Sequence, residues 1–217
     1  MTTPSAAAVD RDLGGERRFT RKGQATRDRI VAAATELIAR VGVAGTSTEQ
    51  VRDAAGVSGS QLYHYFDSKQ ALIRAVITRQ ADAVGRDGAA PQLGALDSFD
   101  ALEAWADAAI ERQALNQGRG ECSLGTLAAE LSASDEDSRA ELSTGFLRWK
   151  DVLRDGLARM QERGELRAEA DLDELAYALL TALQGGSLMS QTLRSTDPFK
   201  AAMVAALAYV RSFAGPG

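Results

Sequence analysis

The stretch that decides the fold is STEQVRDAAGVSGSQLYHYFDSK, residues 47–69. It holds two segments that each begin with a serine and carry a glutamine three residues later: Ser47 with Gln50, and Ser58 with Gln61. This spacing is typical of a capping box, in which the two side chains satisfy backbone N–H groups at the start of a helix. The stretch therefore predicts two helix starts close together in the chain.

Gly56 separates the two segments, at a place where helices often end on a glycine. Leu62 and Phe66 follow four residues apart, so both would face inward from the second helix. We therefore expect short helices over 47–55 and 59–65 that meet at a tight turn. This is a helix-turn-helix, with its second helix placed to enter a DNA major groove.

The same residues resemble the signature of the TetR family of transcriptional regulators. The matching positions are Ala55, Gly56, Val57, Ser58, Leu62, Tyr63, Tyr65, Phe66, Ser68, Lys69 and Leu72. The resemblance covers residues 25–80, with Tyr65 where a histidine is often found and Arg52 where many relatives carry a small residue. It implies an all-α fold of about nine helices, with an N-terminal three-helix helix-turn-helix DNA-binding domain followed by a helical ligand-binding and dimerisation domain.

A recognition helix needs short polar residues at its start, because these can reach base edges. Gln61 is the best candidate base reader, since its amide can bond adenine in bidentate fashion. The resemblance adds phosphate contacts from Tyr63, Tyr65 and Lys69. The complete set of predicted DNA contacts is Thr26, Arg27, Thr46, Ser47, Thr48, Ser58, Gly59, Ser60, Gln61, Tyr63, His64, Tyr65 and Lys69. For the three hydroxyls at 46–48 simple helix capping is the alternative, and for Arg27 a plain surface charge.

Charge divides the chain unequally. Residues 1–80 hold 12 Lys/Arg against 8 Asp/Glu, and residues 81–217 hold 13 against 22, which gives +4 and −9 and the total of −5. A basic N-terminal part on an acidic remainder fits a nucleic-acid module joined to a body that does not bind DNA. Chance scatter in an acidic protein is the alternative explanation.

Other sequence features exclude several classes of protein. No apolar run is long enough for a membrane span, and the N-terminus lacks the apolar core of a secretory signal. The single cysteine, Cys122, cannot form an internal disulfide, which favours a cytoplasmic protein. Since no nucleophile elbow, phosphate loop or metal-spaced Cys/His cluster occurs, we expect neither an enzyme nor a bound cofactor or metal.

The order of periodic segments predicts the domains. Residues 1–23 are polar, glycine-containing and basic at their end, and we expect a disordered arm that either follows DNA or is simply solvated. Residues 24–70 form the predicted helix-turn-helix DNA-binding domain, beginning with a helix over 25–41. Residues 71–217 form the predicted helical effector-binding and dimerisation domain, interrupted by a glycine-rich linker at 85–98.

Apolar and aromatic residues in the body are candidates for an effector pocket. The predicted lining is Phe99, Trp105, Phe146, Trp149, Met160, Leu183, Gln184 and Met189, although each of the apolar ones is also a normal core residue. Gly185 and Gly186 are costly within a helix, and either close helix packing or room for a ligand would explain them.

Two apolar helices, at about 172–194 and 198–213, end the chain. The resemblance implies that they form a homodimer interface, and closure of the monomer core is the alternative. The leading hypothesis is therefore a dimeric repressor that a small apolar or aromatic effector releases from a palindromic operator. The alternatives are a thiol-responsive regulator switched at Cys122, and a helical ligand-binding protein or enzyme with a vestigial DNA module.

Overall fold

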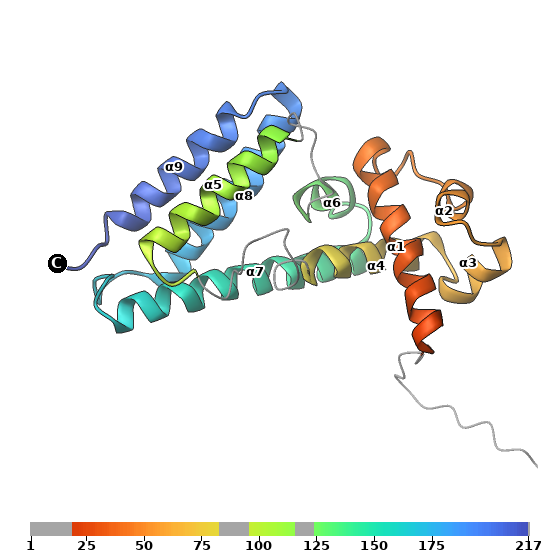
Figure 1. Ribbon diagram of the computed structural model, residues 1–217, viewed down its shortest axis with the longest axis horizontal. Helices are drawn as coiled ribbons and strands as arrows, with labels where there is room; N and C mark the ends of the chain where they lie inside the picture. The colour runs from red at the N-terminus through yellow and green to blue at the C-terminus, as the bar shows by residue number, and fades with distance from the viewer. Residues whose placement is uncertain (1–18, 83–95, 116–123, 217) are drawn as a thin grey trace, which may run out of the picture.

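A computed structural model describes residues 19–82, 96–115 and 124–216, and this part of the chain forms nine α-helices and no strand (Figure 1). The predicted all-α fold is therefore confirmed. The helices are α1 (Arg21–Val41), α2 (Thr48–Ala55), α3 (Gly59–Tyr65), α4 (Lys69–Asp82), α5 (Phe99–Leu115), α6 (Leu124–Leu131), α7 (Glu136–Glu162), α8 (Leu172–Leu193) and α9 (Asp197–Arg211).

The predicted capping chemistry is present at both helices of the helix-turn-helix. Ser47 accepts a hydrogen bond from the Gln50 N–H while Gln50 accepts one from the Ser47 N–H, at 3.2 and 2.8 Å. The same reciprocal pair joins Ser58 and Gln61. Gly56 ends α2 in the left-handed region, with φ at 62°. Glycine adopts this conformation without the strain that a Cβ would bring.

Two helices begin earlier than predicted. α1 starts at Arg21 because Thr20 caps it by accepting from the Gly23 N–H, so the end of the predicted arm is already helical. α7 starts at Glu136, because Asp135 accepts from the Ser138 N–H, whereas apolar periodicity alone predicts a helix over 140–163. In both cases the helix begins about one turn before the predicted start, because polar residues separate the cap from the first buried apolar side chain, Ile30 in α1 and Leu142 in α7.

The helices bury two apolar clusters. The first unites α1–α4 with α6 and the start of α7, and the second unites α5, α8 and α9 with the rest of α7. α7 therefore belongs to both, and Figure 1 shows it running beside α4 at one end and beneath α5 and α8 at the other. The predicted domain boundary at residue 70 falls within α4, the helix that leads from the DNA module to the body.

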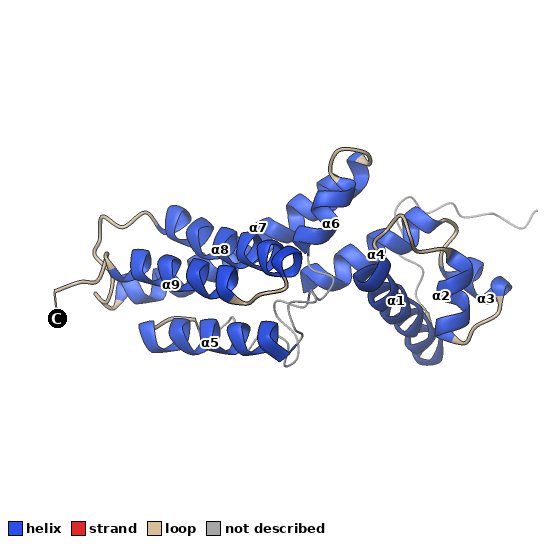
Figure 2. Cartoon of the chain, turned by 90° about the horizontal axis from the view of Figure 1, so that it is seen from above, coloured by secondary structure: helices blue, strands red, loops and turns tan. Residues whose placement is uncertain are grey.

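α8 and α9 pack closely as an antiparallel pair, with α5 against α9 (Figure 2). Gly186 lies at the contact, where an added Cβ would come within 3.0 Å of the Phe199 Cα atom. Gly185 faces the other way into open space. Of the two explanations considered for this glycine pair, close helix packing applies to Gly186.

The described segments contain neither a candidate membrane span nor a metal-binding cluster. None of their helices is long and apolar enough to cross a membrane. Nowhere in these segments do three or more metal-binding side chains gather.

Candidate nucleic-acid interface

α3 turns its polar side chains outward and its apolar ones inward. Leu62 and the following Phe66 are buried in the first cluster, as predicted. Ser60, Tyr63 and His64 are exposed on the opposite side. Tyr63 exposes 57% of its surface, which is unusual because tyrosine normally covers most of its ring. The exposed side of α3 is thus a polar and aromatic ridge.

At the start of α3 the backbone is accessible, whereas the side chain of Gln61 already has a hydrogen-bond partner. Nothing lies within 4 Å of the place where a Cβ on Gly59 would be, so another molecule can approach the backbone there. The Gln61 Oε1 atom already accepts from the Ser58 N–H at 2.9 Å. A bidentate bond to adenine needs this oxygen as well as the Nε2 donor. The second lone pair of this oxygen is left for adenine, so the capping box fixes the direction from which Gln61 can approach a base.

An aromatic cluster joins the start of α1 to the end of α3. The ring of Phe19 lies 5.0 Å from Tyr65 and 6.2 Å from His64, and the latter two rings lie 5.0 Å apart. Tyr65 is consequently half-buried. Phe19 was not among the predicted site residues, because the sequence placed it in a disordered arm. The available signal was an aromatic residue directly before the N-cap Thr20.

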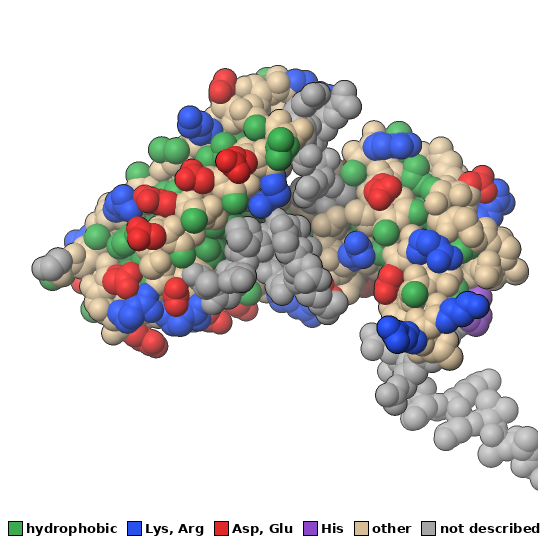
Figure 3. Space-filling view, in the orientation of Figure 1, with side chains coloured by type: hydrophobic (Ala, Val, Ile, Leu, Met, Phe, Trp, Pro, Cys, Tyr) green, Lys and Arg blue, Asp and Glu red, His purple; other side chains and the backbone are tan. Residues whose placement is uncertain are grey.

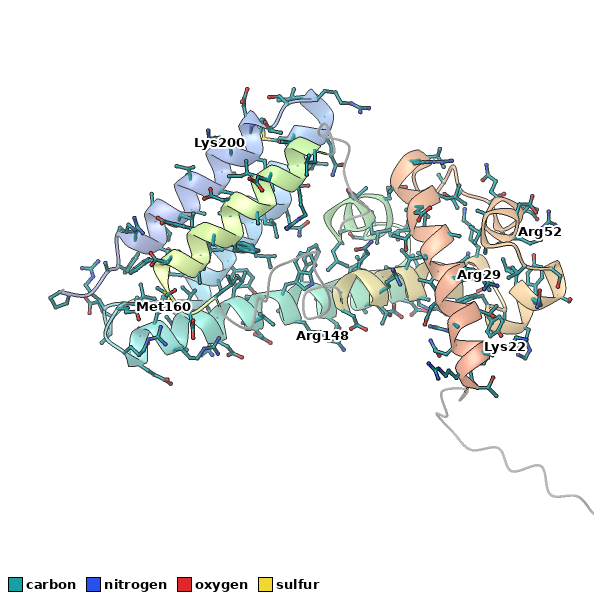
Figure 4. The ribbon with its side chains drawn as sticks, viewed as in Figure 1. Lys22, Arg29, Arg52, Arg148, Met160 and Lys200 are labelled. Atoms are coloured by element: carbon teal, nitrogen blue, oxygen red, sulfur yellow. The ribbon has the colours of Figure 1, made fainter. Side chains whose placement is uncertain are left out.

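Basic side chains lie beside this cluster at the start of α1 and farther away on α1 and α2. Arg21 and Lys22 are exposed in the first turn of α1. Figure 4 shows Lys22 and Arg29 on α1 and Arg52 on α2, and Figure 3 shows basic side chains close to the single histidine. The positive end of the α1 dipole adds to this charge. The resulting surface is suited to phosphate groups.

Several basic side chains also have internal contacts. The Arg27 guanidinium lies 5.3 Å from the centre of the Phe66 ring, a cation–π contact that anchors it against the module. Arg29 donates to the Ala55 carbonyl at 2.9 Å and so closes the end of α2. Arg52 pairs with Asp53 at 2.6 Å. This pairing offsets the positive charge of Arg52.

The residues predicted around the start of α2 differ in accessibility. Thr46 is only 4% exposed, and its hydroxyl donates to the Gly42 carbonyl at 2.8 Å, so the predicted phosphate contact is wrong for this side chain. Ser47 and Thr48 are half-buried at the helix start. The pKa of Glu49 beside them is lowered, chiefly by a backbone hydrogen bond, which keeps a negative charge at this edge of the surface.

Two more predicted contacts have internal partners. The Thr26 hydroxyl donates to the Lys22 carbonyl at 3.1 Å. The Lys69 Nζ atom donates to the Val43 carbonyl at 2.8 Å. A lysine in the first turn of a helix opposes the helix dipole, and this hydrogen bond offsets that cost within the protein itself.

The residues predicted to line an effector pocket do not come together at one place. Phe146 and Trp149 are half-buried and contact both clusters, whereas Met160 lies at the far end of α7 (Figure 4). Met160 follows Phe146 by fourteen residues of continuous helix. Given the rise of an α-helix, that separation is roughly 21 Å. One small ligand does not span that distance.

The other predicted pocket residues are also divided. Trp105 is buried, Phe99 and Leu183 are half-buried, and Met189 is 55% exposed on the outer side of α8. Gln184 accepts from the Gly125 N–H at the start of α6, at 3.2 Å. Met189 therefore does not belong to an internal pocket. The proposed thiol, Cys122, lies outside the described residues.

Comparison with known proteins identifies the class that this fold and surface define. Residues 30–76 match the family model for bacterial regulatory proteins of the tetR family, and residues 98–206 match the model for the tetracyclin repressor-like C-terminal domain. The protein is thus a DNA-binding transcriptional regulator of the helix-turn-helix type. The chain belongs to the TetR family.

Individual relatives agree with this assignment. The transcriptional regulator AcuR of Cereibacter sphaeroides is 28% identical over 176 residues, which cover 78% of each chain. The crystal structure of a TetR transcriptional regulator from Chloroflexus aurantiacus superposes with a TM-score of 0.72 at 25% identity, covering 91% of this chain and all of that one. The reduced form of NemR from Escherichia coli shares the fold, with a TM-score of 0.73 at 24% identity, covering 88% of this chain and all of that one.

Proposed function

We propose that this regulator is a homodimeric repressor that binds a palindromic operator through α3 and leaves it when a small apolar or aromatic effector binds the body. The observation that carries the DNA-binding part is the outward side of α3. Its backbone is open at Gly59, and its exposed side chains, Ser60, Tyr63 and His64, are polar or aromatic. A helix with an open, polar start is what major-groove reading requires.

The contacts divide by their chemistry. Ser60, His64 and the Nε2 donor of Gln61 would face base edges from α3. Tyr63 and the hydroxyls of Ser47 and Thr48 would reach phosphates, together with Arg21 and Lys22 at the start of α1. Lys69 would join them with the Nζ protons that the Val43 carbonyl does not use. Phosphate contacts fix the register of the helix, and base contacts provide the sequence preference.

The dimer part rests on an uncovered apolar face of α8 and α9. On α9 the exposed small or apolar residues recur at helical spacing: Ala201, Val204, Ala205 and Ala208. On α8 the exposed apolar residues are Tyr177, Leu188, Met189 and Leu193. A face of this kind is expected to be buried by association, and two helices from each of two subunits make a four-helix bundle.

The effector part rests on Phe146 and Trp149, the two aromatic residues that contact both clusters. The Trp149 Nε1 atom donates to the Ala81 carbonyl in the last turn of α4, at 3.1 Å. α4 carries the DNA module at its other end. A ligand that displaced the indole would alter the support of α4, and it would favour release only by binding that altered state better.

Fluorescence anisotropy tests the DNA-binding part. The protein is titrated against its own upstream DNA and against DNA that it selects from a random pool, each at two salt concentrations of about 50 and about 200 mM. We expect tight binding that weakens at least tenfold at the higher salt, since each neutralised phosphate releases counterions. Tyr63→Ala should abolish tight binding, and Tyr63→Phe, which loses only the hydroxyl that reaches the phosphate, should weaken it by about tenfold. A folded dimer that selects no DNA would contradict the proposal.

The effector part needs a different readout. A panel of small aromatic compounds is screened for release of the bound DNA, and any active compound is tested again on Trp149→Phe. The smaller ring lacks the N–H that holds the Ala81 carbonyl, so we expect weaker DNA binding without effector and release at a changed effector concentration. An unchanged response would exclude Trp149 from the effector site.

A further inference from the structure

The backbone of Val43 is held from two sides by charged groups of two different helices. Val43 is a buried residue in the loop between α1 and α2. Its N–H donates to Glu130 Oε2 of α6 at 2.7 Å, and its carbonyl accepts from the Lys69 Nζ atom of α4 at 2.8 Å. A buried backbone N–H needs such a partner, and here the partner comes from the C-terminal domain.

The loop around Val43 is shaped to receive the carboxylate. Gly42 has φ at 76°, a conformation that side-chain-bearing residues rarely adopt. A Cβ on Gly42 would lie 3.1 Å from Glu130 Oε2, so a larger residue would also displace this oxygen. The Thr46 hydroxyl closes the loop by donating to the Gly42 carbonyl. The loop is thus ordered by its own contacts as well as by Glu130.

The position of this loop gives the contact its importance. Ser47, the N-cap of α2, follows Val43 by four residues, so the loop is the entrance to the helix-turn-helix. α6 is fixed in turn to the body, because it packs against α7 and α8 and its Gly125 N–H donates to Gln184 of α8. Glu130 therefore connects the entrance of the DNA module to a helix that is anchored in the body.

We propose that Glu130 is a positioning residue for operator binding: it holds the DNA module at one orientation to the body and thereby sets the half-site spacing that a dimer accepts. This inference rests on the proposed function. Two recognition helices in a symmetric dimer fit only operators whose half-sites lie at the matching separation. A DNA module that can change its orientation about α4 fits operators with several half-site separations. Loss of the Glu130 contact therefore reduces the selectivity of the dimer for one half-site spacing.

The test compares three variants on operators of different spacing. The operator is the sequence that the wild-type protein selects from random DNA, together with the same half-sites moved one base pair closer or farther apart. Glu130→Ala removes the acceptor, whereas Glu130→Gln keeps an amide oxygen that can accept from the Val43 N–H. Glu111→Ala removes the same charge from an exposed site on α5 and serves as the control.

We expect Glu130→Ala to reduce the ratio of affinities between the selected and the shifted operators by about tenfold, the equivalent of one charge-assisted hydrogen bond. Glu130→Gln and Glu111→Ala should keep the wild-type ratio. An equal loss of affinity at every spacing, or an unchanged ratio in Glu130→Ala, overturns this inference and leaves the proposed function intact. A wild-type protein that selects no DNA overturns both.

Discussion

At the scale of single residues, Gln61 has to serve two purposes. Its side-chain oxygen accepts from the Ser58 N–H, and its position on α3 suits base reading. Helix capping and adenine recognition both use that oxygen, which has one lone pair for each, whereas only adenine recognition needs the Nε2 donor. The stability of α3 and its affinity for DNA can therefore be changed separately at neighbouring positions.

We expect Gln61→Glu to preserve stability and to weaken operator binding by at least about tenfold. Glutamate keeps the capping oxygen and suits the positive end of a helix, but it lacks the Nε2 donor and repels phosphates. Ser58→Ala should lower the free energy of unfolding by about 1 kcal/mol through loss of the cap. Urea denaturation and DNA titration of both variants measure the two effects, and parallel losses in Gln61→Glu would show that capping is all that Gln61 does.

Glu141 on α7 provides a prediction about pH. Burial raises its pKa, Arg74 partly opposes this, and Oε2 is buried without a hydrogen bond. A carboxyl whose pKa is raised in the folded state stabilises the protein below its ordinary pKa of 4.5, and this contribution is lost as the pH rises through the folded-state value. We therefore expect Glu141→Gln to raise the melting temperature at pH 7 and to have little effect near pH 4.

Glu136, on the same helix, is the matched control, because its pKa is shifted in the opposite direction. Its hydrogen bond from Arg139 lowers its pKa, so its contribution is present above the ordinary pKa of 4.5 and is lost as the pH falls. Glu136→Gln should lower the melting temperature at pH 7 and converge with the wild type in acid. The same direction of change in both variants would show that net charge, rather than the local environments, controls the pH dependence.

At the scale of elements, adjacent glycines of α8 should respond oppositely to one added methyl group. Gly186→Ala places its Cβ 3.0 Å from the Phe199 Cα atom of α9, so we expect a loss of about 1–3 kcal/mol in the free energy of unfolding. Gly185→Ala meets nothing within 4 Å and should gain up to about 1 kcal/mol of helix stability. Denaturant unfolding at one protomer concentration measures both. A loss at Gly185 as well would mean that another surface covers it.

The elements that the sequence predicts well are those fixed by neighbouring residues. The two capping boxes and the turn at Gly56 depend on side chains within three residues of one another, and these predictions were correct. The contact between Glu130 and Val43 spans 87 positions, and no local pattern indicates it. The burial of Thr46 likewise depends on how the loop packs, so the neighbouring sequence does not show whether its hydroxyl can reach a phosphate. Periodicity identified which body residues are apolar but did not reveal that Phe146 and Met160 lie far apart along α7.

At the scale of the whole molecule, α7 connects the DNA module to the C-terminal helices α8 and α9. It contributes to both apolar clusters, and Trp149 joins it by a hydrogen bond to the last turn of α4. Glu130 gives the body a second contact with the DNA module, through α6. Under the proposed function, a movement in the body on effector binding would reach the module through both contacts, at α4 and at the entrance to α2. A substitution at one of them should weaken the effector response without abolishing it.

The uncovered face of α8 and α9 leads to the last prediction, which concerns assembly. Val204 lies on α9 among exposed alanines and is itself 55% exposed. If this face is the dimer interface, a carboxylate there would be buried without a partner, which is strongly unfavourable.

We expect Val204→Asp to be a folded monomer at micromolar concentration in analytical ultracentrifugation. Its operator affinity should fall about a hundredfold or more, because two half-sites are no longer engaged together. Leu147→Asp is the matched control, since Leu147 is 46% exposed on α7 rather than on α8 or α9, and it should remain dimeric. Dissociation of Leu147→Asp with an intact Val204→Asp dimer would move the interface from α8 and α9 to α7.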